Sequence, residues 1–103
     1  MNKRIEDKIK AFVSARDWDR YHNPKDLALS VTLEASELLE NFQWLSAEDA
    51  VHKNEQNIKD EIADVMIYSI MLAQKLDLDI ETIILEKIRK NSEKYPSGQK
   101  HTF

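Results

Sequence analysis

The sequence predicts one all-α domain, and three observations support this. The 103 residues include one glycine and two prolines, which suits a helical protein better than a turn-rich sheet protein. Apolar residues recur at helical spacing, as in Leu27, Val31 and Leu38. Helix-start signals precede such segments, as where Asn23 is followed by Pro24. The length fits a single domain over residues 1–103.

The first half of the chain predicts two helices. Residues 2–15 carry apolar side chains on one helical face. A polar, aromatic connection over residues 16–22 follows. The second helix is expected to begin at Pro24, with Asn23 as its cap, and to run to about Trp44 or Leu45.

The second half predicts two more helices and one ambiguous segment. Ser46 followed by Asp49 resembles a capping box, so a short helix or an irregular turn is expected before the third helix. The third helix, over residues 58–76, is apolar over more than one face and must be buried on several sides, which favours self-association. Asp79 is expected to cap a fourth helix over residues 80–93, and an irregular tail begins at about residue 96.

Composition excludes several classes of protein. A net charge of −4 without a basic cluster argues against nucleic-acid binding. The absence of cysteine excludes disulfides and thiolate metal sites. The first residues lack the apolar core of a signal peptide, and no apolar run reaches the ~18 residues of a membrane span. A cytoplasmic protein without membrane partners is therefore expected.

Four acidic residues interrupt the apolar stretches of two helices. Glu34 and Glu37 lie three apart in the second helix, and Glu61 and Asp64 lie three apart in the third. Residues at this spacing are surface neighbours, with Cβ atoms ~5–6 Å apart. Burying an unpaired carboxylate is costly, so these groups need a cation or must stay protonated. If the helices pack antiparallel, the two pairs can face each other and hold a hard cation such as Mg²⁺.

Two alternatives stand beside the metal interpretation. Acid pairs arise by chance in a helical chain with 19 acidic residues, and Glu37 with Glu40 is a pair that a solvated face would explain. Ferritin-like di-iron proteins need Glu-x-x-His pairs on helices, whereas the acid-x-x-His pairs here, as at Asp19 and His22, lie outside the apolar helical stripes. Di-iron chemistry is therefore disfavoured, while a solvated face stays open.

Aromatic and basic residues accompany the acids. Trp18 and Trp44 flank the second helix, and Tyr68 lies one turn after Asp64. Such rings could stack on a nucleobase, or the tryptophans could simply close the ends of a helical bundle. One face of the fourth helix carries three polar residues that could contact phosphates or form a solvated face: Lys87, Asn91 and Lys94.

The chain resembles the MazG-type all-α nucleotide pyrophosphohydrolases, in particular their dCTP-pyrophosphatase-like branch. The resemblance rests on Glu34-x-x-Glu37 followed by Glu61-x-x-Asp64, which matches the acidic metal motif of that family. Three further segments strengthen it: residues 18–24 (WDRYHNP), 39–44 (LENFQW) and 87–96 (KIRKNSEKYP).

This resemblance implies a four-helix fold, a homodimer or a dimer of dimers, and Mg²⁺-dependent cleavage of a nucleoside triphosphate to monophosphate and pyrophosphate, with Mn²⁺ as a substitute ion. The four acids would be the metal ligands. The residues that would bind substrate are Trp18, His22, Trp44, Tyr68, Lys87, Asn91 and Lys94. A pyrimidine such as dCTP or a modified analogue is the expected substrate. The rival function is a non-catalytic helical homodimer that binds a partner or divalent ions.

Overall fold

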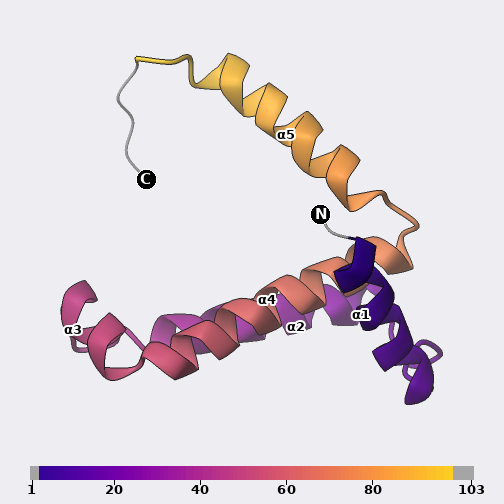
Figure 1. Cartoon of the computed structure of the whole chain (residues 1–103), viewed down its shortest axis with the longest axis horizontal. Coiled ribbons are helices and arrows are strands. Elements are labelled where there is room, and N and C mark those ends of the chain that lie inside the picture. Colours follow the sequence, from indigo (N-terminus) through magenta and orange to yellow (C-terminus); the bar gives the residue numbers. More distant parts are fainter. Residues whose placement is uncertain (1–2, 99–103) are drawn as a thin grey trace.

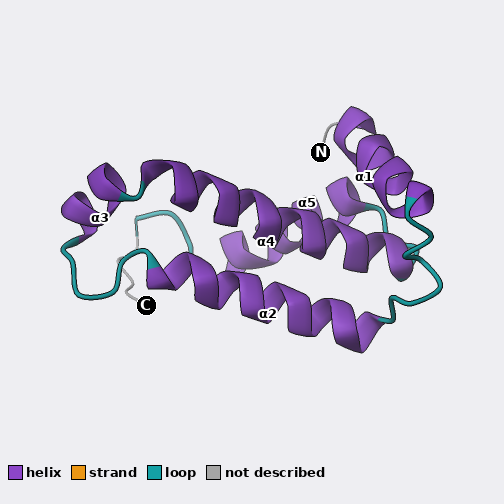
Figure 2. Cartoon of the chain, turned by 90° about the horizontal axis from the view of Figure 1, so that it is seen from below, coloured by secondary structure: helices purple, strands orange, loops and turns teal. Residues whose placement is uncertain are grey.

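The computed structural model describes residues 3–98, which fold into helices joined by short loops, with no strand in that range (Figures 1 and 2). The helices are α1 (Lys3–Ala15), α2 (Pro24–Glu40), α3 (Ala47–Lys53), α4 (Glu55–Lys75) and α5 (Ile80–Lys94). The prediction of an all-α fold is confirmed. The short α3 occupies the segment that the sequence left open, and the predicted tail after residue 98 lies outside the described residues.

The centre of the fold is an antiparallel pair formed by α2 and α4, which lie side by side along their lengths (Figure 2). α1 packs against the C-terminal part of α4, and α3 lies at the opposite end of the pair. Buried apolar side chains gather where α1, α2 and α4 meet: Ile9, Val13, Leu27, Ile70, Met71, Ala73 and Ile80. This arrangement places the middle of α2 opposite the middle of α4.

Three predicted caps form as expected. The side chain of Asn23 accepts a hydrogen bond from the backbone N–H of Asp26 at 2.9 Å, and Pro24 follows as the first residue of α2. Ser46 caps α3 in the same way. Asp79 caps α5, which begins at Ile80 as predicted. Each cap satisfies an N–H that the helix itself leaves without a partner.

The predicted end of the second helix was wrong. α2 stops at Glu40 rather than at about Trp44 or Leu45, and residues 41–45 form turns. Trp44 has a φ of 67°, a left-handed conformation that cannot continue a right-handed helix. The side chain of Asn41 instead donates hydrogen bonds to the last carbonyls of α2. No glycine or proline lies at this end, so no local signal predicted it.

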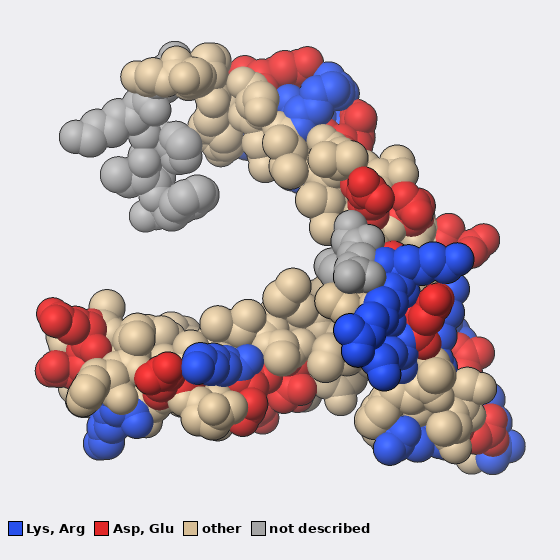
Figure 3. All heavy atoms as spheres, in the orientation of Figure 1, with Lys and Arg blue, Asp and Glu red and all other residues tan. Residues whose placement is uncertain are grey.

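The last helix extends away from the α2–α4 pair (Figure 1). The Cα radius of gyration is 16.4 Å, whereas a compact domain of this length has about 13 Å. The apolar residues of α5 are exposed in a single chain: Ile83, Ile84, Leu85 and Ile88. Figure 3 shows that the concave side between α5 and α4 carries few charged side chains. Of the helices described, none is long and apolar enough to cross a membrane.

Candidate metal centre

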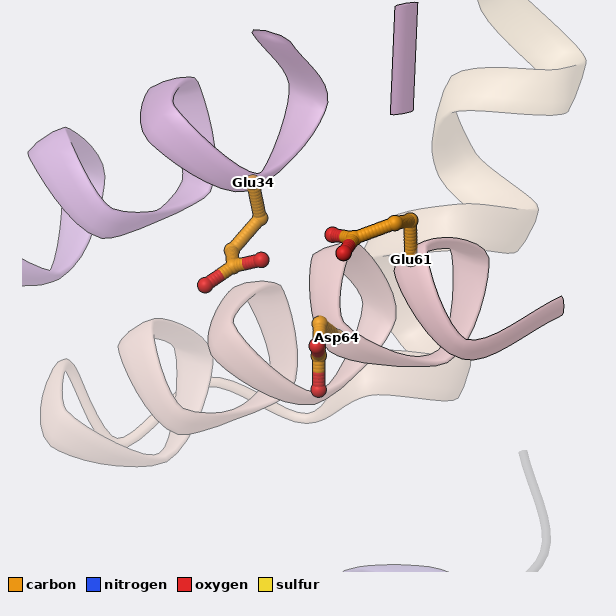
Figure 4. Close-up of side chains that lie close together, drawn as sticks. All are labelled: Glu34, Glu61 and Asp64. Atoms are coloured by element: carbon orange, nitrogen blue, oxygen red, sulfur yellow. The ribbon is translucent and has the colours of Figure 1, made fainter. Parts of the chain in front are cut away.

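Three acidic side chains converge between α2 and α4. Glu34 comes from α2, and Glu61 and Asp64 come from α4 (Figure 4). One carboxylate oxygen of each lies within 4.8 Å of the others. The antiparallel packing therefore brings together acids that lie far apart in the sequence.

Two oxygens of this cluster are buried without a partner. Oε2 of Glu34 and Oε2 of Glu61 are shielded from solvent, and neither has a hydrogen-bond partner among the described residues. Buried polar atoms are almost always satisfied, because an unpaired one costs free energy. A hard divalent cation prefers carboxylate oxygens as ligands, so the donor set and its unsatisfied oxygens fit such an ion.

Without a cation, burial and the neighbouring acids disfavour the charged forms of Glu34 and Glu61. Burial, together with contacts to Glu37 and Glu61, raises the pKa of Glu34 from 4.5 to about 7. Burial also raises the pKa of Glu61, while the neighbouring carboxyl of Glu34 acts in the opposite direction. Near neutral pH the metal-free cluster therefore holds a proton that ordinary carboxyl groups would have lost.

A pH dependence of stability follows from this shift. The pKa of Glu34 is higher in the folded state than in the unfolded chain, so its favourable contribution is complete below about pH 4.5 and is lost as pH rises toward about 7. Glu34→Gln removes the group whose contribution is lost as pH rises. In thermal unfolding experiments with a chelator, the Tm of this variant should therefore fall less with pH over that window, or rise more, than the Tm of the unchanged chain. Identical slopes would contradict the assignment of the shift to Glu34.

The fourth predicted acid, Glu37, lies beside this group rather than inside it. Its side chain is exposed, yet its carboxylate contributes to the raised pKa of both Glu34 and Glu61. Glu37 therefore stands at the solvent side of the cluster. From this position it can add negative charge to a bound cation or reach a water molecule beside it.

An apolar cavity of about 410 Å³ adjoins the cluster and shares Asp64 with it. Its lining includes two predicted aromatic residues, Trp18 and Tyr68. Phe12 also lines it and meets the Trp18 ring edge-on, with ring centroids 5.3 Å apart. Phe12 belongs to the apolar residues of the segment predicted as the first helix, residues 2–15, and periodicity cannot distinguish a core residue from one that lines a cavity.

His22 lies close to this cavity without lining it. Its ring contacts Trp18 with centroids 5.8 Å apart. It lines a second cavity of about 310 Å³ beside Lys75, whose ammonium group donates hydrogen bonds to Asp19. His22 is therefore placed to hold Trp18 rather than to touch the acids.

The other predicted substrate contacts do not line the aromatic cavity within one chain. Trp44 is 93 % exposed in the turns after α2. The basic face of α5 is exposed on the extended helix: Lys87, Asn91 and Lys94. A single copy of the chain thus presents the acids and one aromatic cavity, but not these four residues around them.

Comparisons with known proteins identify a family and several similar chains. Residues 29–103 match the MazG-like family. The rat protein dCTP pyrophosphatase 1 is 34 % identical over 90 residues, which cover 82 % of this chain and 53 % of the relative. The human dCTP pyrophosphatase 1 is 31 % identical over 91 residues, covering 84 % of this chain and 54 % of the relative.

A solved structure extends the comparison to the fold. The crystal structure of a pyrophosphatase from Archaeoglobus fulgidus superposes with a TM-score of 0.84 at 34 % identity and covers 92 % of both chains. This chain spans about half the length of the curated relatives that it matches. The resemblance expected from the sequence is confirmed: the chain belongs to the MazG-like family.

Proposed function

We propose that this chain hydrolyses a nucleoside triphosphate to the monophosphate and pyrophosphate, with Mg²⁺ bound by its acidic cluster. The observation that carries the proposal is the convergence of Glu34, Glu61 and Asp64, with two buried oxygens that lack a partner. The names of the similar proteins support a pyrophosphatase, and the rat and human relatives favour dCTP or a related pyrimidine nucleotide as substrate.

The chemistry follows from the residues of the cluster. The three convergent acids, with Glu37 beside them, would hold Mg²⁺ or Mn²⁺. When bound, such an ion neutralises phosphate charge and lowers the pKa of water. Attack by water at the α-phosphorus breaks the bond to the bridging oxygen, and pyrophosphate leaves. The proton of the attacking water goes to a carboxylate of α2, Glu34 or Glu37.

The aromatic cavity is the proposed site of the base. Trp18 and Tyr68 line it, and Asp64 connects it to the acids. An aromatic wall supplies stacking surface for a flat base beside the phosphate site. The volume of about 410 Å³ is of the size that small-molecule sites have.

We further propose that the working form is a homodimer or a dimer of dimers. The chain exposes 8271 Å², whereas a compact monomer of its 12.1 kDa mass would expose about 6,000 Å². The apolar face of α5 and exposed apolar residues of α4, such as Met66, would be covered by a second copy. The phosphate contacts expected from Lys87, Asn91 and Lys94 would then come from α5 of the partner.

A screen of nucleoside triphosphates tests the function. With Mg²⁺ present, at least one pyrimidine deoxynucleotide should yield pyrophosphate and its monophosphate in equal amounts, and a chelator should stop the reaction. Release of orthophosphate instead would indicate attack at the γ-phosphorus and contradict the proposed reaction. No turnover of any triphosphate would favour the rival, a non-catalytic helical dimer.

Metal binding should also stabilise the fold. A ligand that binds only the folded state, present at 100 times its Kd, adds about 2.7 kcal/mol of stability. This raises Tm by roughly 10–20 °C in a domain of this size. We expect Mg²⁺ to raise the Tm of the unchanged chain and to have a much smaller effect on Asp64→Asn. Differential scanning fluorimetry with Mg²⁺, and with Na⁺ at matched ionic strength, makes this comparison. An equal rise in both proteins would contradict the proposed ligand set.

A further inference from the structure

Among residues 3–98, Asn41 is the one polar residue that is buried, with 6 % of its surface exposed. It is the cap residue at the C-terminal end of α2. Its side-chain Nδ2 donates to the carbonyl oxygens of Glu37 and Leu38 at 3.3 Å. Its Oδ1 accepts from Nδ2 of Asn57 at 2.7 Å, and its backbone carbonyl accepts from Nδ2 of Asn54 at 2.8 Å. One residue thereby joins the end of α2 to the start of α4.

This link lies close to the metal centre along both helices. Asn41, the cap that follows α2, comes four residues after Glu37 and seven after Glu34, and Asn57 precedes Glu61 by four residues in α4. Because α2 and α4 run antiparallel, a turn back along α2 is level with a turn forward along α4. The register that pairs Asn41 with Asn57 therefore also places Glu37 opposite Glu61. Three residues further along each helix, it places Glu34 opposite Asp64.

Apolar packing alone fixes the register of one helix along another poorly. A slip of one residue moves a side chain ~1.5 Å along the helix and turns it by about 100°. The carboxylate oxygens of the centre lie within 4.8 Å of one another, so a slip of this kind would separate them. Asn41 is buried whereas Asn57 is exposed, so the hydrogen bond between their amides is partly buried. In coiled coils a single buried Asn sets the register at some cost in stability.

We propose that the Asn41–Asn57 hydrogen bond positions the metal centre by fixing the register of α2 on α4. Asn41 and Asn57 act through the helices that carry the acids and are positioning residues rather than ligands. The inference rests on the proposed function in so far as the acids bind a divalent cation.

The direct test removes the link from the α4 side. Asn57→Ala is expected to lower the affinity of the chain for Mn²⁺ by roughly tenfold or more, as losses of supporting residues do at other metal sites. The affinity is measured by the paramagnetic resonance signal of free Mn²⁺ in a titration, well below Tm and with circular dichroism confirming full helicity.

Asn54→Ala is the matched control. It removes a hydrogen bond of similar length to the same residue, Asn41, but from the junction of α3 and α4 rather than from the row that carries Glu61. We expect Asn54→Ala to keep the Mn²⁺ affinity of the unchanged chain even where its Tm falls as far as that of Asn57→Ala. A role in stability alone would lower both Tm values and leave both affinities unchanged.

A second variant keeps the test decisive if Asn57→Ala does not fold. The double variant Asn41→Leu/Asn57→Leu replaces the amide pair with apolar side chains, which support folding without a unique register. We expect it to remain helical and to bind Mn²⁺ at least about tenfold more weakly. Unchanged Mn²⁺ affinity in the folded variants would overturn the inference and leave the metal centre standing. Absence of Mn²⁺ binding by the unchanged chain would overturn the metal centre itself, and the inference with it.

Discussion

Glu61→Gln is expected to reduce pyrophosphate release by at least about 100-fold, since loss of a residue that merely supports a metal ligand already costs 10–100-fold. The substitution keeps the size of the side chain but removes the negative charge from a buried oxygen that lacks a partner. Because the metal-free acids repel one another, the fold should survive and the metal-free Tm should hold or rise. A pyrophosphate assay and a thermal melt of the same preparation separate the two effects.

Asp60→Asn is the matched control for that experiment. Asp60 precedes Glu61 on α4 but is exposed, and its carboxylate accepts a hydrogen bond from Gln56 within the same helix. We expect its turnover to match that of the unchanged chain. Full turnover in Glu61→Gln, or equal losses in both variants, would show that the acids of α4 are not the metal ligands.

Ile84→Asp is expected to convert the proposed dimer to a monomer and to remove most of the activity. Ile84 is exposed in a single chain and lines an apolar cavity between α4 and α5. A carboxylate buried there by a second copy would lose its hydration without gaining a partner. Light scattering after gel filtration gives the mass, and the pyrophosphate assay gives the activity.

Lys90→Asp introduces the same side chain elsewhere on α5. Lys90 lies outside the apolar row formed by Ile84 and Ile88. This variant should keep the assembly state of the unchanged chain. A monomeric unchanged chain with full activity would contradict the proposal that α5 of a second copy completes the site.

Local signals predicted the helices well, because their causes lie in the sequence itself. The caps at Asn23, Ser46 and Asp79 depend on residues three positions away, and all three form. The end of α2 could not be predicted in this way. The cap residue Asn41 also accepts hydrogen bonds from Asn54 and Asn57, which only the packing of α4 brings to it.

The candidate site was predictable to the extent that it follows from helical spacing. The spacing of Glu61 and Asp64 places both on one face, and packing of α4 on α2 brings them to Glu34. Spacing could not show that Glu37 is exposed, nor that Trp44 lies away from the aromatic cavity in a single chain. Both depend on how the helices, and the copies of the chain, pack.

Anomalous diffraction from crystals soaked in Mn²⁺ locates the bound ion without relying on turnover. We predict a peak bounded by carboxylate oxygens of Glu34, Glu61 and Asp64, and its loss in Asp64→Asn crystals treated in the same way. A strong Mn²⁺ peak elsewhere on the chain, with no density between these acids, would contradict this prediction.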